Sequence, residues 1–489
     1  MKLFRTVGFL GALSLIGGVG CQHHPDLEPV SLELPLSWES SEAGGDLDRR
    51  LDWAVYGDAT LVAWIERALE RNLDLAMAME RLEESRAQTR GVRSALVPDL
   101  SATPGYNSNR LSQNNRQLSQ FGGGAGPAAI NLQASQWRVP LDLSYELDVF
   151  DRVRQAIEAA TFNDAAQALD VQALRNTVAS EVARLYFRIA GLDGELEILD
   201  AMRETLEHTL AGNRRRVAAG LDAESVVLSL QGDLAALNAE AHDLEGQRED
   251  LISGLALLCG QAGMEAEFAT EALRRTPPTL PAGLPSRLLH RRPDVASAEA
   301  SLEAAAAEVG VARAQFLPSI RLTGSAGLES VSLTELVSMD SRFWSLGPDV
   351  SIPIDLGGGL KADLAAATSR WAQAKLAFQQ TALTAFQETH SALRRLGAAR
   401  NAHEATESGF RHASENLALM GRRTAQGLES ELDLLGARYA TLQEERRARR
   451  SLATLYGVSV ELFKALGGGW GIEALDASPS ERVRLSLVD

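Results

Sequence analysis

The sequence is poor in several features that would each indicate a particular class of protein. It has two cysteines, so no disulfide framework is available. It has 48 Lys and Arg residues and 65 Asp and Glu residues, a net charge of −17. This charge argues against nucleic-acid binding, which needs cationic side chains to replace phosphate counterions. Aromatic residues make up 5%, too few for a typical compact aromatic core. With 23% charged and 45% hydrophobic residues, the chain is nevertheless not of the disordered class.

The sequence also lacks a long apolar run after its N-terminus. No stretch of eighteen apolar residues occurs there, which excludes membrane-spanning helices. A membrane β-barrel, whose strands carry a weaker alternating signal, is not excluded.

The N-terminus has the pattern of an export signal. Lys2 and Arg5 precede an apolar stretch of small residues over 7–19, as in secretory signal peptides. It ends in a bacterial lipobox-like sequence, Gly18 to Cys21, although lipoboxes prefer Leu where Gly18 stands. We predict a signal peptide over 1–20 and lipidation of Cys21; the alternative is an ordinary signal with an incidental cysteine. By resemblance to lipoproteins, Gln22 favours the outer membrane, and two or more acyl chains would give stable anchoring.

The chain contains an internal duplication. In its first part, residues repeat at an offset of 220, and further along at an offset of 207. The first offset pairs Arg71 with Arg291, Asp74 with Asp294, Leu82 with Leu302, Arg93 with Arg313 and Pro98 with Pro318. The second pairs Thr161 with Thr368, Arg216 with Arg423, Gly220 with Gly427, Leu221 with Leu428 and Gly260 with Gly467. The first copy therefore carries an insertion between the two blocks, and the halves are otherwise collinear.

Each half is expected to contain two long strands. Residues 137–149 alternate strictly between apolar and polar, which predicts a strand with one apolar face. Thirteen residues at ~3.3 Å each span ~43 Å, enough to cross a bilayer at a tilt. Alternation also predicts strands over 320–328 and 344–356, with a weaker one over 100–106. A soluble sheet with one wet face is the alternative interpretation.

The rest of each half is expected to be helical. Residues 60–95 have the periodicity of one helix. Over 153–210, apolar residues recur every three or four positions and no proline occurs, as in a coiled coil. At 1.5 Å per residue the latter would be ~87 Å long. A second helix over 222–258 follows, and the second half repeats both over 360–420 and 430–466.

Such a chain cannot close a barrel alone. Four strands fall short of the roughly eight needed for a small barrel, and open strand edges are not tolerated in lipid. Several copies must therefore complete one barrel, with the apolar strand faces toward lipid and a polar lumen. The predicted lumen-facing strand residues are Arg138, Asp142, Glu146, Asp148 and Asp349. Helices longer than any membrane is thick would continue the conduit outside it.

Several segments together resemble the TolC/OprM family of outer-membrane efflux lipoproteins (NodT-type). The resemblance runs from about Trp53 to Trp470. It is carried by Arg291 to Asp294, Ala312 to Ala314, Phe316 to Ile320, Leu322 to Gly327, Tyr145 to Phe150, Trp344 to Pro348 and Lys464 to Trp470.

The resemblance implies an α+β membrane protein that is a homotrimer. Each protomer would give four transmembrane β-strands to a trimeric β-barrel and its coiled-coil-like helices to a periplasmic α-barrel. The implied partners are a periplasmic adaptor (membrane fusion) protein, an inner-membrane RND-type pump and outer-membrane lipid. The implied organisation is a lipidated belt segment (21–58), a first repeat (59–260), a linker and belt segment (261–290), a second repeat (291–467) and a tail (468–489). The insertion at 122–127 would form an extracellular loop.

The turns of the two long helical hairpins are the implied site. In the family, these tips form the closed periplasmic end and dock the adaptor. The tip candidates are Arg215, Arg216, Gly220, Leu221, Arg422, Arg423, Gly427 and Leu428. The gate candidates are Asp222, Glu224, Glu429, Glu431, Asp433 and Leu434. Ordinary capping is the alternative role for the acidic ones, since helix N-termini favour acidic side chains. Gly436 stands where the close family pattern has Asp, so the gate acid is either absent or replaced by Asp433.

No catalytic or cofactor-binding pattern is present in the sequence. The Gly-rich runs at 122–124, 357–359 and 467–469 lack the Gly-Lys-Ser/Thr of a phosphate loop. We therefore expect no enzyme activity, no metal site and no cofactor apart from the lipid on Cys21. The function predicted is the exit duct of a tripartite efflux pump. The alternatives are a duct for type I protein secretion or metal export, or a structural envelope protein that does not conduct.

Overall fold

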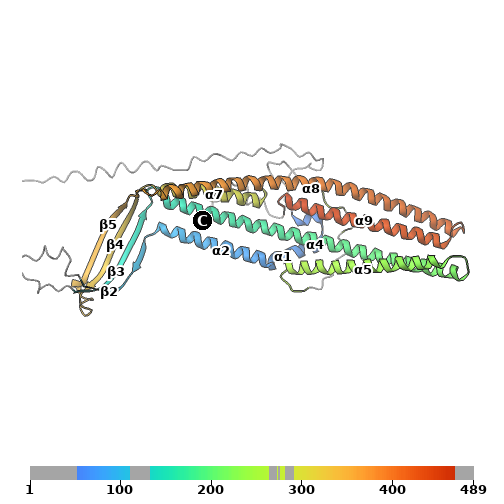
Figure 1. Cartoon of the computed structure of the whole chain (residues 1–489), viewed down its shortest axis with the longest axis horizontal. Coiled ribbons are helices and arrows are strands. Elements are labelled where there is room, and N and C mark those ends of the chain that lie inside the picture. The colour runs from blue at the N-terminus through green and yellow to red at the C-terminus, as the bar shows by residue number, and fades with distance from the viewer. Residues whose placement is uncertain (1–51, 111–132, 264–272, 274–275, 281–290, 469–489) are drawn as a thin grey trace, which may run out of the picture. The chain divides into compact units, whose positions relative to one another are not determined.

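A computed structural model describes residues 52–110, 133–263, 273, 276–280 and 291–468 (Figure 1). The predicted signal peptide, Cys21, the insertion loop at 122–127, and most of the two belt segments and the tail lie outside the described residues. The chain divides into two compact units. The strand unit includes 85–163 and 302–374, and the helical unit includes 164–301 and 375–489 together with 30–84.

The strand unit holds one antiparallel sheet in the order β1-β3-β4-β5, with β2 also paired to β3. Its strands are β1 (Asp99–Ala102), β2 (Gly105–Arg110), β3 (Gln133–Leu147), β4 (Ser319–Ser330) and β5 (Arg342–Ser351). β1 and β2 are one strand interrupted at Pro104, because Ala102 pairs with Leu141 and Gly105 with Arg138 in the same register. Proline has no N–H to give to a ladder, which explains the interruption. The four predicted strands are therefore present.

The predicted strand ends were partly wrong. β5 ends at Ser351 instead of 356, since Pro353 cannot donate to a ladder and Leu356 already turns back to the carbonyl of Ile354. β3 begins four residues earlier than predicted and ends at Leu147, before Asp148.

Strand pairing confirms the duplication. Leu100 pairs with Leu143 in the first half, and their equivalents at offsets 220 and 207, Ile320 and Val350, pair in the second. The two halves therefore have the same register within each strand pair.

One face of the sheet is apolar and open in the single chain. Trp137, Leu141 and Leu143 of β3 share a face with Leu322 of β4 and Leu346 of β5. The exposed fractions of Leu141, Leu346 and Trp344 are 47%, 65% and 80%. Contiguous apolar surface of this kind marks contact with lipid or protein.

The four longest helices form two pairs of equal length. They are α1 (Ala59–Arg71), α2 (Leu73–Arg93), α4 (Arg152–Ala218), α5 (Glu224–Leu258), α7 (Pro293–Ala314), α8 (Gly359–Ala425) and α9 (Glu431–Ala465), with short 3₁₀ turns η2 (Trp53–Tyr56), η3 (Ser94–Leu96) and η5 (Met339–Ser341). α4 and α8 both have 67 residues, and α5 and α9 both have 35, so the duplication extends to helix length. The helix predicted over 60–95 is two helices, because Asn72 is extended between α1 and α2.

The long helices are held by the apolar stripe that the sequence predicts. Val178, Val182, Leu185 and Ile189 of α4 are buried in the main core cluster of the helical unit. The segment before α1 joins this core, since the rings of Trp53 and Phe463 lie 4.2 Å apart. Its Asp58 caps α1 and accepts a hydrogen bond from Tyr186 at 2.8 Å.

The long helices form two hairpins, α4 with α5 and α8 with α9. At the base of each, the glycine after the second helix makes the same close backbone contact. Gly260 follows α5 with a φ of 66°, and Gly467 follows α9 with a φ of 70°. A Cβ at Gly260 would lie 2.5 Å from the carbonyl oxygen of Arg71, and one at Gly467 would lie 3.0 Å from that of Arg291. Glycine is needed for both the backbone conformation and the close approach. Cys259, just before Gly260, is buried, and this burial raises the pKa of its thiol.

Among the residues that the structure describes, no helix combines the length and the apolar character required to span a membrane.

Candidate functional site

The two hairpin tips have the same backbone. In the first, Gly220 has a φ of 71° and the N–H of Leu221 donates to the carbonyl of Arg216 at 2.9 Å. In the second, Gly427 has a φ of 74° and the N–H of Leu428 donates to Arg423 at 2.9 Å. Such bonds satisfy the last helical carbonyls and require a left-handed residue, here glycine.

The tips are shorter than predicted. The helices predicted to end at 210 and 420, α4 and α8, continue to Ala218 and Ala425, so Gly212 and Gly421 lie inside them. The four tip arginines therefore occupy the last helical turns, where positive charge complements the helix dipole. They are Arg215, Arg216, Arg422 and Arg423.

Each tip is crossed by one ion pair at the same position. Arg216 Nε donates to Asp222 at 2.6 Å, and Arg423 Nη2 donates to Glu429 at 2.7 Å. The hydrogen bond from Arg216 holds the pKa of the Asp222 carboxyl below its usual range. These residues were predicted to lie at the tips, but their pairing was not predicted.

The N-termini of α5 and α9, the helices that follow the tips, are capped differently. Ser430 and Asp433 form a capping box at the start of α9. The hydrogen bonds from Ser430 hold the pKa of Asp433 below its usual range. At the equivalent place before α5, Ala223 has no capping side chain.

The gate candidates therefore have different surroundings. Asp222 and Glu429 are in ion pairs and Asp433 is in a cap, whereas Glu224 and Glu431 lie exposed in the first turns of α5 and α9. Leu434 is half-buried near Gly421. Their gating roles stay predictions.

The tips present apolar and positive side chains outward. Leu221 and Leu428 are 67% and 61% exposed, and Arg215 and Arg422 are exposed beside them. The combination occurs twice in the chain at equivalent positions, so one protomer offers the same small surface on each hairpin.

The two hairpins touch close to the tips through α4 and α9. A Cβ at Gly212 of α4 would lie 2.6 Å from Cδ2 of Leu432 in α9, so a larger residue there would have to displace the end of this leucine side chain. Nearby, Arg438 of α9 forms an ion pair with Glu204 of α4 at 3.7 Å.

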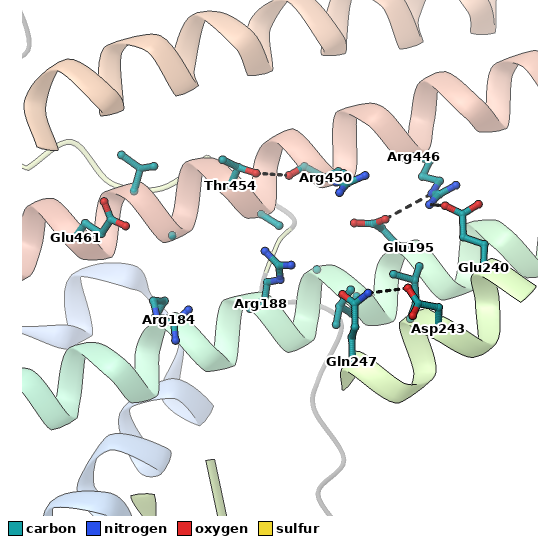
Figure 2. Close-up of a pocket in the computed structure, with 16 residues that line it drawn as sticks. Arg184, Arg188, Glu195, Glu240, Asp243, Gln247, Arg446, Arg450, Thr454 and Glu461 are labelled. Carbon is teal, nitrogen blue, oxygen red and sulfur yellow. Dashed lines mark hydrogen bonds and ion pairs between the residues drawn. The ribbon is translucent and has the colours of Figure 1, made fainter. Parts of the chain in front are cut away.

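Farther from the tips, α4, α5 and α9 line a groove of about 380 Å³ (Figure 2). Figure 2 shows Arg446 of α9 between Glu195 of α4 and Glu240 of α5. Glu195 is 6% exposed and lies 3.5 Å from Arg446. The hydrogen bond with Glu240 raises the pKa of Arg446, which keeps this side chain charged. This cluster was not predictable from the sequence, because its members come from three helices with no sequence motif.

The predicted lumen face of the sheet carries paired charges. Glu146 pairs in register with Arg321, which pairs in register with Asp349. Glu146 also accepts from Arg152 at 2.6 Å, and Arg138 lies 3.6 Å from Glu329. Whether these residues line a lumen stays a prediction.

Two of the lumen candidates have further roles. Asp142 accepts a hydrogen bond from Thr103 at 3.3 Å across the sheet. Asp148 is not a strand residue as predicted: it follows β3 and accepts from the N–H groups of Val153 and Arg154 at the start of α4. It acts as a helix cap because the strand has already ended.

Comparison with known proteins decides the family. The family model described as outer membrane efflux protein matches residues 64–261 and 284–468. The chain belongs to the outer membrane efflux protein family. It is 32% identical over 465 residues to the outer membrane protein OprJ of Pseudomonas aeruginosa, covering 92% of this chain and 93% of OprJ.

Other relatives agree with this membership. The toluene efflux pump outer membrane protein TtgI of Pseudomonas putida is 29% identical, with coverage of 94% of this chain and 97% of TtgI. The solved outer membrane channel MtrE of Neisseria gonorrhoeae, in its open state, superposes with a TM-score of 0.76 at 29% identity, covering 92% of this chain and 98% of MtrE. This efflux protein is accordingly an α+β protein of the outer membrane, as the sequence predicted, and its relatives are named as channels and pump components rather than enzymes.

Proposed function

We propose that this efflux protein is the exit duct of a tripartite pump, a homotrimer that passively conducts small molecules to the exterior. The single observation that carries the proposal is the sheet: its apolar face is open, and β1/β2 and β5 each pair on one side only within the described residues. Unpaired strand edges are incompatible with lipid, whereas an open apolar face favours it. Further copies would pair the edges, and lipid would cover the apolar face.

The strand register supports closure of a barrel by further copies of the chain. β3 and β4 join the two halves of one chain, with Val139 opposite Leu328. Because the halves have the same internal register, the same junction between copies would place Leu346 of β5 in one copy opposite Ser108 of β2 in the next. Both are exposed in the single chain.

The tips would dock the periplasmic adaptor, which in turn would engage an inner-membrane pump. The support is the repeated outward surface of Leu221 and Leu428, each beside an exposed arginine. An adaptor with apolar tips flanked by acidic residues would be complementary to it. Lipidation of Cys21 would add the anchor.

Substrate choice would lie elsewhere in the pump. Relatives of similar identity are named for toluene efflux, for pyoverdine export and for cation efflux. One duct architecture thus accompanies cargo of very different chemistry, which favours selection by the pump.

The test is a deletion and complementation experiment in the source bacterium. Loss of the gene is expected to lower resistance to at least one exported compound, and the intact chain should restore it. A chain whose tip leucines are both replaced, Leu221→Asp with Leu428→Asp, should reach the outer membrane as a trimer and fail to restore resistance. Full restoration by that variant would contradict tip docking.

A further inference from the structure

The apolar face of the sheet carries two charged residues, and both are arginines. The described residues of β1 to β5 on this face are otherwise uncharged; the two exceptions are Arg110 of β2 and Arg342 of β5. Arg110 lies four positions from Tyr106, which pairs with Trp137, and Arg342 lies two positions from Trp344. Even spacing along a strand keeps side chains on one face. Both arginines therefore share the face that lipid would cover, and both are exposed in the single chain.

The two arginines lie at the end of the sheet that is away from the helices. β1 and β4 follow helices and β3 and β5 precede them, so the β2–β3 and β4–β5 connections lie at the opposite end of the sheet. Arg110 is the last residue of β2, and Arg342 is the first residue of β5. In the proposed orientation the helices extend into the periplasm. This end of the sheet then faces the exterior, at the outer leaflet of the membrane.

The strand length places Arg342 near the edge of the apolar band. It lies eight residues from Val350, which is near the helix end of the same face. Eight residues at ~3.3 Å each span ~26 Å, and a strand tilt of ~40° reduces this to a height of ~20 Å. The apolar band of membrane barrels is ~25 Å tall, with aromatic residues at its borders, and Trp344 fits such a border position. Arg342 is therefore expected at the level of the lipid headgroups.

The proposed junction between copies brings one arginine from each copy together. With Leu346 opposite Ser108 of the next copy, the antiparallel register places Trp344 opposite Arg110 two residues farther along. Arg342 is then the diagonal neighbour of Arg110, and such neighbours lie about 7–8 Å apart. Two guanidinium groups at this separation can reach one phosphate group from two sides, and guanidinium is well suited to binding phosphate in a bidentate manner.

The equivalent junction within the chain has no such pair. There, Trp137 of β3 is opposite Ser330 of β4. At offsets of 220 and 207, the equivalents of Arg110 and Arg342 are Ser330 and Ser135. The backbone register and the aromatic residue are thus repeated, while both charges are replaced by hydroxyl groups. Strand pairing by itself does not require the arginines, since the same junction forms with serines.

Neither arginine has a carboxylate partner within the part of the chain that the structure describes. The carboxylates of the described strands lie on the other face; they are Asp99, Asp142, Glu146, Glu329 and Asp349. Cationic side chains beside lipid are neutralised by anionic headgroups, and clusters of them bind such headgroups specifically. The counter-charge for Arg110 and Arg342 is therefore expected from the lipid.

We infer that each seam between copies binds a phosphate group of lipopolysaccharide, the phosphorylated glycolipid of the outer leaflet. Arg110 of one copy and Arg342 of the next hold the phosphate, and Trp344 lies against the adjoining sugar or acyl chain. The inference rests on the proposed homotrimer and its orientation in the outer membrane, and it adds a specific lipid to that proposal.

Native mass spectrometry of the full-length trimer with added diphosphoryl lipid A tests this site. The intact chain should retain one lipid for each seam. Arg110→Ser with Arg342→Ser, which copies the junction within the chain, should weaken binding by about tenfold or more. Lysine at both positions should retain most of the binding, because the charge remains. Lipid A without phosphate groups should bind the intact chain as weakly as the diphosphoryl form binds the double serine variant.

The matched control moves the two arginines to the junction within the chain. Ser135→Arg with Ser330→Arg, added to the double serine variant, should restore binding of diphosphoryl lipid A. Absence of binding by such trimers, with unchanged thermal stability, would show that two arginines in this register do not form the site and would overturn the inference.

The remaining outcomes separate the lipid site from the duct. Equal binding by the intact chain and the double serine variant, or a preference for phosphatidylglycerol over lipid A, would overturn the inference and leave the proposed function intact. Trimers that bind lipid A as expected yet pass no current would contradict the duct and support the site. A purified protein that is monomeric would overturn both.

Discussion

Arg292 occupies in the second half of the chain the place that Asn72 occupies in the first. Asn72 donates a hydrogen bond to the carbonyl of Leu258 at the end of α5, at 3.1 Å, and Arg292 donates to that of Ala465 at the end of α9, at 3.3 Å. Arg292 additionally binds Asp294 and Glu388, each at 2.7 Å. We call this side-chain contact with the end of α5 or α9 the base clasp. It is made by a neutral amide in the first half and by a charged guanidinium with two ion pairs in the second.

Removing the base clasp formed by Arg292 should lower the stability of the second hairpin. Arg292 is 8% exposed, and its replacement removes the hydrogen bond to the carbonyl of Ala465 and the ion pairs with Asp294 and Glu388. We expect Arg292→Ala to cost about 2 kcal/mol. The measurement is the temperature at which the trimer dissociates in detergent. The control is Arg395→Ala, which removes an exposed pair with Glu461 and should cost about 0.5 kcal/mol. Equal effects of the two would contradict this role.

The close contact between α4 and α9 predicts a size limit at Gly191. A methyl group there would meet Ala453, so Gly191→Ala should destabilise the protein by about 1–3 kcal/mol despite the better helix propensity of alanine. Gly194, three residues along the same helix, has open space, and Gly194→Ala should be neutral or stabilising. Thermal dissociation of both variants checks this; a stabilising Gly191→Ala would show that the helices are farther apart.

The tip glycines predict a separation of docking from assembly. Gly220 and Gly427 are left-handed, where valine is strained by about 1–2 kcal/mol. Gly220→Val or Gly427→Val should distort the local turn and impair capture of the adaptor in a co-purification assay. The trimer should persist, since a Cβ at either position would have no atom within 4 Å in the single chain. Loss of the trimer itself would be the contrary result.

The first tip should respond to acid. Arg216 holds the pKa of Asp222 below its usual value, so the pair contributes fully above the ordinary Asp pKa of about 3.9 and is lost as pH falls through the lowered value. A spin label at Ala219→Cys, with Cys259→Ala, should show constant mobility from neutral pH to about pH 4 and rising mobility below it. Asp222→Asn should be mobile throughout, with no acid response; an unchanged transition in that variant would assign the response to another group.

Much of this architecture was predictable because it follows from hydrophobic periodicity and from the internal duplication. The alternation over 137–149 predicted a long two-faced strand, and the Leu and Val stripe of 171–210 predicted the buried face of α4. The paired offsets predicted two hairpins of equal design, including both tip glycines.

What the sequence did not disclose depends on contacts between distant residues. The cluster of Glu195, Glu240 and Arg446 comes from three helices, and only their packing brings the charges together. Asn72 separates α1 from α2: it accepts from the N–H of Leu75 at the start of α2 and donates to the distant carbonyl of Leu258, and this distant contact is absent from local periodicity. Asp148 alternates correctly for a strand, yet capping of α4 uses it instead.

Single-channel recording in planar lipid bilayers tests the central claim most directly. Purified full-length trimers should produce discrete current steps, larger or longer when the tip acids Asp222, Glu429 and Asp433 are replaced by their amides. Trimers that pass no current even with these acids neutralised would contradict the duct and indicate a structural envelope protein.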